Sequence, residues 1–152
     1  MEYLIFNNEI YQFITVFSAK VLVSTLCGFI IGIEREFKQK VAGIRTNILI
    51  CVGCTILTAL SFYLSEGNPN IDPTRIIGQI ITGIGFLGAG VIMKTEDKIV
   101  GVTTAAFIWI VSAIGIMIGT GFLITPIILT VGLMILSRIF EKIENIIKKK
   151  VN

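Results

Sequence analysis

Five long runs of apolar residues, separated by short turns, constrain this chain more than any other feature of its sequence. An α-helix of about 20 apolar residues is long enough to cross the hydrocarbon core of a bilayer. We therefore predict an all-α fold, a polytopic integral membrane helical bundle with about five transmembrane helices. The expected spans are residues 13–33, 46–64, 73–93, 100–118 and 122–137, in a single transmembrane domain that covers residues 1–152.

The composition excludes several classes of function. Hydrophobic residues make up 54% of the chain and charged residues only 15%, against about 25% in ordinary globular domains. The chain has no histidine, which excludes histidine-based zinc sites and histidine general bases. No basic, aromatic-interleaved patch lies outside the apolar runs, so nucleic acid is not an expected partner. No pair of nucleophile and base is visible, so we do not expect an enzyme.

The distribution of basic residues predicts the orientation of the helices. Of the 13 Lys and Arg residues, all but Lys20 and Arg75 fall in two turns on one side of the predicted membrane and in the C-terminal tail. Short segments rich in Lys and Arg stay in the cytoplasm. We therefore expect the N-terminus outside and the C-terminus in the cytoplasm.

Residues 138–152 are predicted to form an amphipathic, basic tail that faces the cytoplasm. Ile139, Ile143 and Ile146 recur at helical spacing among charged residues, a pattern typical of a helix with one apolar face. The alternative is a simple basic stop-transfer anchor after the last span.

Charged residues are almost absent from the predicted spans. Lys20 is the one exception, and at about 10 Å from the outer end of its span its amine can reach the lipid headgroups. A functional ion pair is the alternative for this lysine. No span interior contains Asp or Glu, although magnesium sites in proteins usually use carboxylates. The sequence of the spans therefore does not identify a set of metal ligands.

Glu34 and Arg45 are the candidate structural or functional ion pair. Glu34 ends the first predicted span and Arg45 opens the second, and a short turn brings these two ends together. We expect a buried or half-buried pair, with metal ligation by Glu34 as the alternative. Asp72 directly precedes Pro73 and is expected to cap the third helix.

Glycines are expected to let the helices approach one another closely. The segment from Gly83 to Gly88 matches GxGxxG, but a dinucleotide site also needs a βαβ unit, which this chain lacks. Cys51 and Cys54 spell CxxC inside an apolar helix and are interpreted as small packing residues. The predicted packing positions are Gly28, Gly32, Gly83, Gly85, Gly88 and Gly101.

A second interpretation of the third span is a broken helix that lines a polar cavity. Its lining would come from the few amide and hydroxyl side chains of the third and fourth spans, namely Gln79, Thr82, Thr103, Thr104 and Ser112.

Five segments of the chain closely resemble the MgtC/SapB family of bacterial membrane proteins. They are GIERE (32–36), AGIRT (42–46), DPTR (72–75), GIGFLGAGVI (83–92) and GVTTAAFIW (101–109). The resemblance implies a multi-pass protein of the bacterial cytoplasmic (inner) membrane. It also implies a role in ion homeostasis and adaptation to low magnesium and, in pathogens, in virulence. It covers only the transmembrane domain, whereas many relatives carry an ACT-like cytoplasmic domain after the last span.

Two functions of different class follow from this resemblance. The first is a non-enzymatic modulator that binds another integral membrane complex, with the F-type ATP synthase as a candidate, or that forms a homo-oligomer within the lipid bilayer. The second is a transporter or channel component for magnesium or another divalent cation. No cofactor is expected other than Mg²⁺. The lack of carboxylates inside the spans favours the modulator.

Overall fold

The computed structural model describes residues 2–68, 70–96 and 98–151, with side chains described for residues 14–68, 70–96 and 98–150. These residues form a helical bundle, which confirms the predicted fold class. Its elements are α1 (Glu2–Phe37), α2 (Ile44–Ser65), α3 (Thr74–Gly90), β1 (Met93–Lys94), β2 (Ile99–Val100), α4 (Val102–Gly119) and α5 (Ile124–Val151).

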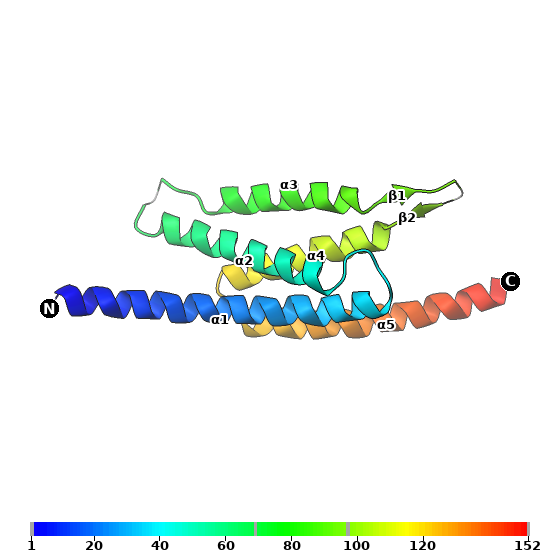
Figure 1. The fold of residues 1–152 in the computed structure, drawn as a ribbon, viewed down its shortest axis with the longest axis horizontal. Helices are drawn as coiled ribbons and strands as arrows, with labels where there is room; N and C mark the ends of the chain where they lie inside the picture. Colours follow the sequence, from blue (N-terminus) through cyan, green and yellow to red (C-terminus); the bar gives the residue numbers. More distant parts are fainter. Residues whose placement is uncertain (1, 69, 97, 152) are drawn as a thin grey trace.

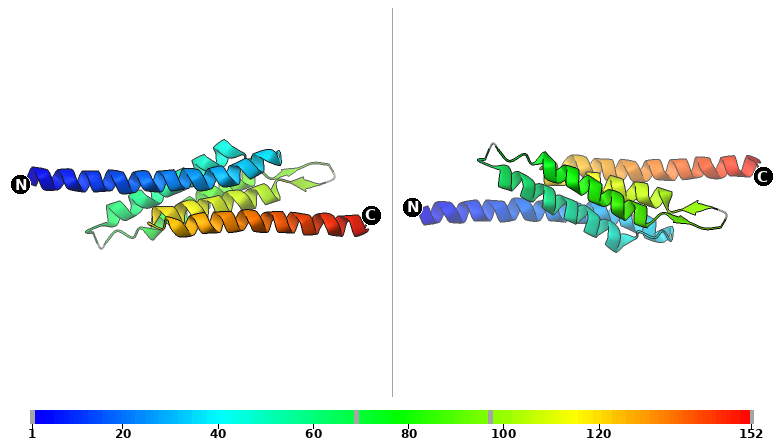
Figure 2. Two further views of the ribbon diagram at one scale, coloured as in Figure 1. Left: turned by 90° about the horizontal axis from the view of Figure 1, so that it is seen from below. Right: turned by 90° about the horizontal axis from the view of Figure 1, so that it is seen from above.

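The helices lie in three layers, with α3 on one side, α2 and α4 in the middle, and α1 and α5 on the other side (Figure 1). α4 is the centre of the bundle because it contacts the four other helices. Consecutive helices run in opposite directions, and the N- and C-termini lie at opposite ends of the bundle (Figure 2). We call the end that carries residues 34–45, the β-hairpin and the C-terminus the basic end.

Within the described residues, four helices are long and apolar enough to cross a membrane: α1 over Ile14–Phe37, and α2, α4 and α5. α3 has 17 residues, a length of about 25 Å. It ends at Gly90, whereas the sequence predicted a span up to residue 93. α5 continues without a break through residues 138–151, so the predicted helical continuation into the tail is confirmed.

A short β-hairpin replaces the simple charged turn that was predicted between the third and fourth spans. Met93 pairs with Val100 and Lys94 pairs with Ile99 in an antiparallel ladder. The β-branched residues Ile99 and Val100 of the second arm favour the extended backbone. Gly101 ends the hairpin with φ of +92°, and a Cβ there would overlap the carbonyl oxygen of Val91. Gly101 is thus required by the turn into α4, not by helix packing as predicted.

The opposite end of the bundle holds the predicted helix cap. A carboxylate oxygen of Asp72 accepts hydrogen bonds from the backbone N–H of Thr74 at 2.9 Å and from its hydroxyl at 2.7 Å. These hydrogen bonds hold the pKa of Asp72 below its ordinary value. The role predicted for Asp72 at the start of α3 is therefore confirmed.

α1 and α2 touch at the two glycines of the first predicted span. A Cβ at Gly28 would lie 2.7 Å from the Cα of Ile48, and one at Gly32 would lie 2.6 Å from the Cα of Ile44. Two helix backbones can approach this closely only where the side chain is a hydrogen atom. The predicted packing role of Gly28 and Gly32 is confirmed.

α2 and α4 meet in the same way at Gly115 and Gly119. A Cβ at Gly115 would overlap the carbonyl oxygen of Cys51, and one at Gly119 would lie 2.5 Å from the Cβ of Thr58. The hydroxyl of Thr55 donates across this contact to the carbonyl oxygen of Gly115 at 3.0 Å. Cys51 and Cys54 are buried, unpaired thiols, which confirms their interpretation as packing residues.

α3 uses its glycines less than the sequence predicted. Ile80, Ile84 and Gly88 form its buried face, and a Cβ at Gly88 would lie in ordinary contact with the Cβ of Ala105 at 3.7 Å. Around Gly83 and Gly85, no atom of the described residues lies within 4 Å of an added Cβ. The packing role predicted for these two glycines is wrong within this chain, because they lie off the face that α3 turns to α2 and α4.

We expect Gly28→Ala and Gly32→Ala to destabilise the protein and Gly85→Ala to leave it intact. The first two substitutions place a methyl group against the backbone of α2, and overpacking of this kind costs about 1–3 kcal/mol. At Gly85 the methyl group meets open space, and helix propensity favours alanine by about 1 kcal/mol. Thermal unfolding of the purified variants in mild detergent measures the difference. Equal destabilisation by all three would contradict the close contact between α1 and α2.

Candidate functional site

A cluster of polar and charged side chains lies at the basic end, where α1, α4 and α5 meet. We call it the polar cluster and define it as Glu34, Arg35, Lys38, Thr104 and Glu141. It forms because α1 continues through Phe37, several residues beyond the predicted end of the first span. The last turn of α1 therefore carries charged residues into the bundle instead of into a solvated loop.

Arg35 is the most deeply buried charge of the cluster, with 2% of its surface exposed. A terminal nitrogen of its guanidinium donates to the hydroxyl of Thr104 at 3.0 Å, and the guanidinium lies 4.3 Å from the centre of the Phe107 ring. A buried cation needs such partners, because leaving water without them is costly. Arg35 thus connects the end of α1 to the start of α4.

Glu34 is also buried, but its partner differs from the predicted one. Its carboxylate pairs with Lys38, one helical turn later on the same side of α1. Within the residues whose side chains are described, Arg45 is exposed and forms no ion pair. Arg45 precedes the buried Asn47 by two residues, about 200° of helical rotation, so it lies on the opposite face of α2.

Lys38 connects α1 to α5. Its ammonium contacts Glu34 and also Glu141, which lies on the extended part of α5. Burial lowers the pKa of Lys38, but the hydrogen bonds that its ammonium donates to Glu141 and Glu34 outweigh this and raise the pKa above its ordinary value. The two carboxylates therefore share one cation, and a metal ion would have to displace the lysine to use both.

Two side chains close the turn between α1 and α2. A carboxylate oxygen of Glu36 accepts a hydrogen bond from the N–H of Ile44, at the start of α2, at 3.1 Å. The helix dipole stabilises a negative charge at this end of the helix. Asn47 is fully buried, and its amide donates to the carbonyl oxygens of Ala42 at 3.0 Å and Gly43 at 2.7 Å. A side chain at Gly43 would overlap the carboxylate of Glu36.

The five residues predicted to line a polar cavity are not brought together. Gln79, Thr82 and Thr103 are exposed, and the hydroxyl of Thr82 donates back to the carbonyl oxygen of Gly78 at 3.0 Å. Thr104 is buried against Arg35, and Ser112 is buried with its hydroxyl on the carbonyl oxygen of Trp109 at 2.7 Å. The predicted cavity is wrong, since α3 is a continuous helix and only Thr104 and Ser112 of the five side chains are buried.

Lys20 lies at the end of the bundle opposite the basic end. The sequence left two alternatives for it, contact with the lipid headgroups or an ion pair, and the structure shows a third arrangement. Its ammonium donates to the carbonyl oxygen of Gly119 at 2.9 Å. This carbonyl belongs to the last turn of α4, where the helix dipole favours a cation. Lys20 is thus held by backbone rather than by an acidic partner.

The described residues contain no group of three or more His, Cys, Asp or Glu that could hold a metal ion. Sequence analysis counted Arg35 only among the basic residues of a turn and did not single out Asn47. The signal for Arg35 was the segment from Ile33 to Phe37, in which charged residues follow an apolar run without a glycine or proline that would end the helix.

Comparison with known proteins finds the same segments in one family. The profile of the MgtC family matches residues 21–146. The chain is 44% identical over 106 residues to the protein named "Putative magnesium transporter YhiD" of Escherichia coli strain K12, covering 66% of this chain and 49% of that protein. It is 43% identical over 109 residues to Protein SapB of Bacillus subtilis, covering 68% and 47%. It is 35% identical over 123 residues to Protein MgtC of Brucella abortus, covering 81% and 50%.

The chain spans about half of the length of these relatives. No solved structure matches it.

We expect Arg35→Ala to destabilise the protein by about 2–4 kcal/mol, through the lost charge-assisted hydrogen bond and ring contact. Arg45→Ala, which removes the same charge from an exposed site, should change stability by less than about 0.5 kcal/mol. Unfolding of both variants in detergent micelles measures the two values. A larger loss for Arg45→Ala would mean that the wrong arginine has been assigned to the cluster.

A double-mutant cycle tests the partner of Glu34. Lys38→Met combined with Glu34→Gln should show a coupling energy of about 0.5–3 kcal/mol, and Arg45→Met with Glu34→Gln should show none. Because the pKa of Lys38 is raised, its protonated form is favoured by folding, so the coupling persists at neutral pH and is lost as the pH rises through that raised value. Coupling of Glu34 to Arg45 instead would contradict the pairing with Lys38 and support the pair predicted from the sequence.

Proposed function

This chain belongs to the MgtC family, and we propose that it is a non-enzymatic modulator of another membrane complex during adaptation to low magnesium. It acts through contacts between helices inside the membrane and does not itself conduct magnesium. Its place is the bacterial cytoplasmic membrane, with the C-terminus inside. The F-type ATP synthase and a second copy of this chain are the candidate partners.

The observation that carries this proposal is that several polar groups inside the bundle are bonded to carbonyl oxygens of the bundle itself. Thr55 donates to the carbonyl oxygens of Cys51 and Gly115. Ser112 donates to a carbonyl oxygen of its own helix, and Lys20 donates to Gly119. Mg²⁺ gives up its water only for well-placed oxygen ligands. A path for the ion through this interior would have to break these bonds and separate backbones that glycines hold in contact.

The helix faces left uncovered support the same proposal. The glycines of α1 and α4 are used in contacts with α2. On α3, in contrast, small residues remain exposed along one side, namely Gly78, Thr82, Gly85 and Ala89. Spacings of three and four residues place them in one stripe, where a helix of a partner can approach the backbone closely.

Transport is the competing function. The printed name of the Escherichia coli relative refers to magnesium transport. For this chain, transport would require a polar path made by several copies, because Gln79, Thr82 and Thr103 lie on the outside of the single bundle. A direct measurement of flux separates this function from modulation.

The experiment combines growth and flux for three forms of the protein. A strain that lacks its own family member is grown at limiting magnesium with the wild type, Gly85→Leu or Gly132→Leu. Gly132 is the matched control, since it also has no atom of the described residues within 4 Å of an added Cβ but lies on α5. The same proteins are reconstituted in liposomes for magnesium uptake.

We expect the wild type and Gly132→Leu to restore growth without magnesium uptake. Gly85→Leu should accumulate to the same level in the membrane and fail to restore growth, because it blocks the exposed side of α3. Saturable magnesium uptake by the wild type would overturn the proposal in favour of transport. Growth with Gly85→Leu would exclude the small-residue side of α3 as the contact surface.

A further inference from the structure

The part of α5 from Arg138 to Lys150 extends along the basic end with every side chain exposed. It carries five basic and two acidic residues. Both acids are engaged, Glu141 with Lys38 and Glu144 with Lys148. Among the described residues, Arg138, Lys142, Lys149 and Lys150 have no acidic partner. This segment therefore presents positive charge that the chain itself does not neutralise.

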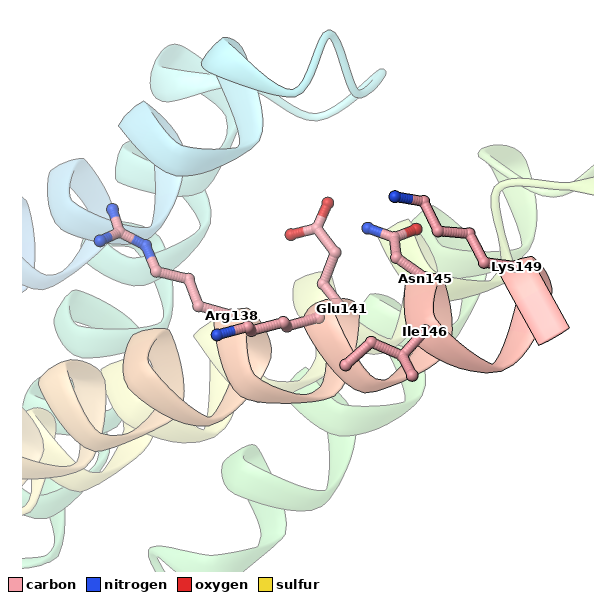
Figure 3. Close-up of a pocket in the computed structure, with 6 residues that line it drawn as sticks. Arg138, Glu141, Asn145, Ile146 and Lys149 are labelled. Atoms are coloured by element: carbon pink, nitrogen blue, oxygen red, sulfur yellow. The ribbon is translucent and has the colours of Figure 1, made fainter.

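Three of these charges, on Arg138, Lys142 and Lys149, lie on one side of the helix. Arg138, Lys142, Asn145 and Lys149 follow one another at spacings of four, three and four residues, which places them in a single stripe. Together with Glu141 and Ile146 they line an open hollow of about 390 Å³. Figure 3 shows the side chains of Arg138, Glu141, Asn145 and Lys149 projecting from the same side of α5. Each of the basic groups and the amide offers N–H donors.

The ion pair between Lys38 and Glu141 sets the level of this hollow relative to the membrane. The apolar run of α1 ends at Ile33, and Lys38 lies five residues beyond it, about 7 Å along the helix. Glu141 pairs with Lys38 and therefore lies at the same level. The headgroup layer beyond the core is about 5–7 Å thick on each side. Arg138 is about one helical turn closer to the core than Glu141, so it falls within the layer in which the phosphates of the lipids lie, and the rest of the hollow extends from this layer toward the water.

The other side of the same segment is apolar. Ile139, Phe140 and Ile143 are all about half exposed, and they continue the lipid-facing side of α5. A cationic stripe beside an apolar stripe, at the membrane surface, is the pattern that binds anionic lipids. A soluble anion would leave the apolar side without a partner.

We propose that the hollow on α5 binds the phosphate headgroup of an anionic phospholipid of the leaflet at the basic end. The guanidinium of Arg138 and the amine of Lys142 hold the phosphate, the amide of Asn145 donates to it, and Lys149 approaches from the aqueous side. The acyl chains lie along the isoleucines of the same helix. This site is independent of the role of α3 in the proposed function.

The test measures lipid binding to the full chain, purified in a neutral detergent. Native mass spectrometry counts bound dioctanoyl phosphatidylglycerol, dioctanoyl phosphatidylcholine and inorganic phosphate for three proteins: the wild type, Arg138→Gln with Lys142→Gln, and Lys94→Gln with Lys98→Gln. The last pair is the matched control, since it removes the same charge from exposed lysines at the same end. Circular dichroism confirms that all three are folded.

We expect the wild type and the hairpin variant to bind phosphatidylglycerol alike, and the α5 variant to bind it about tenfold to thirtyfold more weakly, from about fivefold for each basic residue at a membrane surface. Phosphatidylcholine should bind weakly to all three. If both double variants bound phosphatidylglycerol equally weakly, binding would depend on the overall surface charge and not on this site, which would overturn the proposal. Inorganic phosphate that binds as tightly as phosphatidylglycerol, or an α5 variant that binds like the wild type, would overturn it as well.

Discussion

Close contact between helix backbones is the interaction on which the rest of this structure depends. Inside a membrane, apolar side chains gain nothing by leaving lipid for protein, so helices associate through tight packing and hydrogen bonds. Gly28 and Gly32 bring α1 onto α2, and Gly115 and Gly119 bring α4 onto α2. At this distance the hydroxyl of Thr55 reaches the carbonyl oxygen of Gly115 on the neighbouring helix. The small residues therefore supply both the contact area and the geometry for the polar links between helices.

The polar cluster follows from this packing. Once α1 lies against α2 and α4, its last turn carries Arg35 between the helices, where Thr104 and Phe107 are its partners. Lys38 then reaches Glu141 and fixes α5 beside α1. The charged groups at the basic end thus do two things, since some hold the helices in register and others, on the extended part of α5, remain available to the membrane surface. The bundle leaves α3 as the helix whose small residues face outward, which is the basis for proposing contact with a partner there.

Several features could be predicted because each depends on residues that are close in sequence. Apolar runs predicted the helices, the Gly28 and Gly32 pair predicted a contact, and Asp72 before Pro73 predicted a cap. The predictions failed where the partner of a residue is distant in sequence, or where the contact depends on which face of a helix the residue occupies. Glu34 was assigned to Arg45 because a short turn separates them, but the continued helix favours Lys38. Gly83 and Gly85 are small enough to allow a close helix contact, but they lie off the face of α3 that packs against α2 and α4.

The amino-acid sequence by itself determined the membrane-spanning class, the number of helices, the small residues available for packing and the family. These properties depend on local residue patterns, hydropathy and sequence motifs. They do not depend on which residues become neighbours in the folded protein. Only the tertiary structure decided which glycines are covered, that Arg35 and Asn47 are buried, that Thr104 binds an arginine instead of lining a cavity, and that Glu141 on α5 pairs with Lys38. Each of these depends on how the helices rotate and pair, and rotation is set by contacts between residues far apart in the chain.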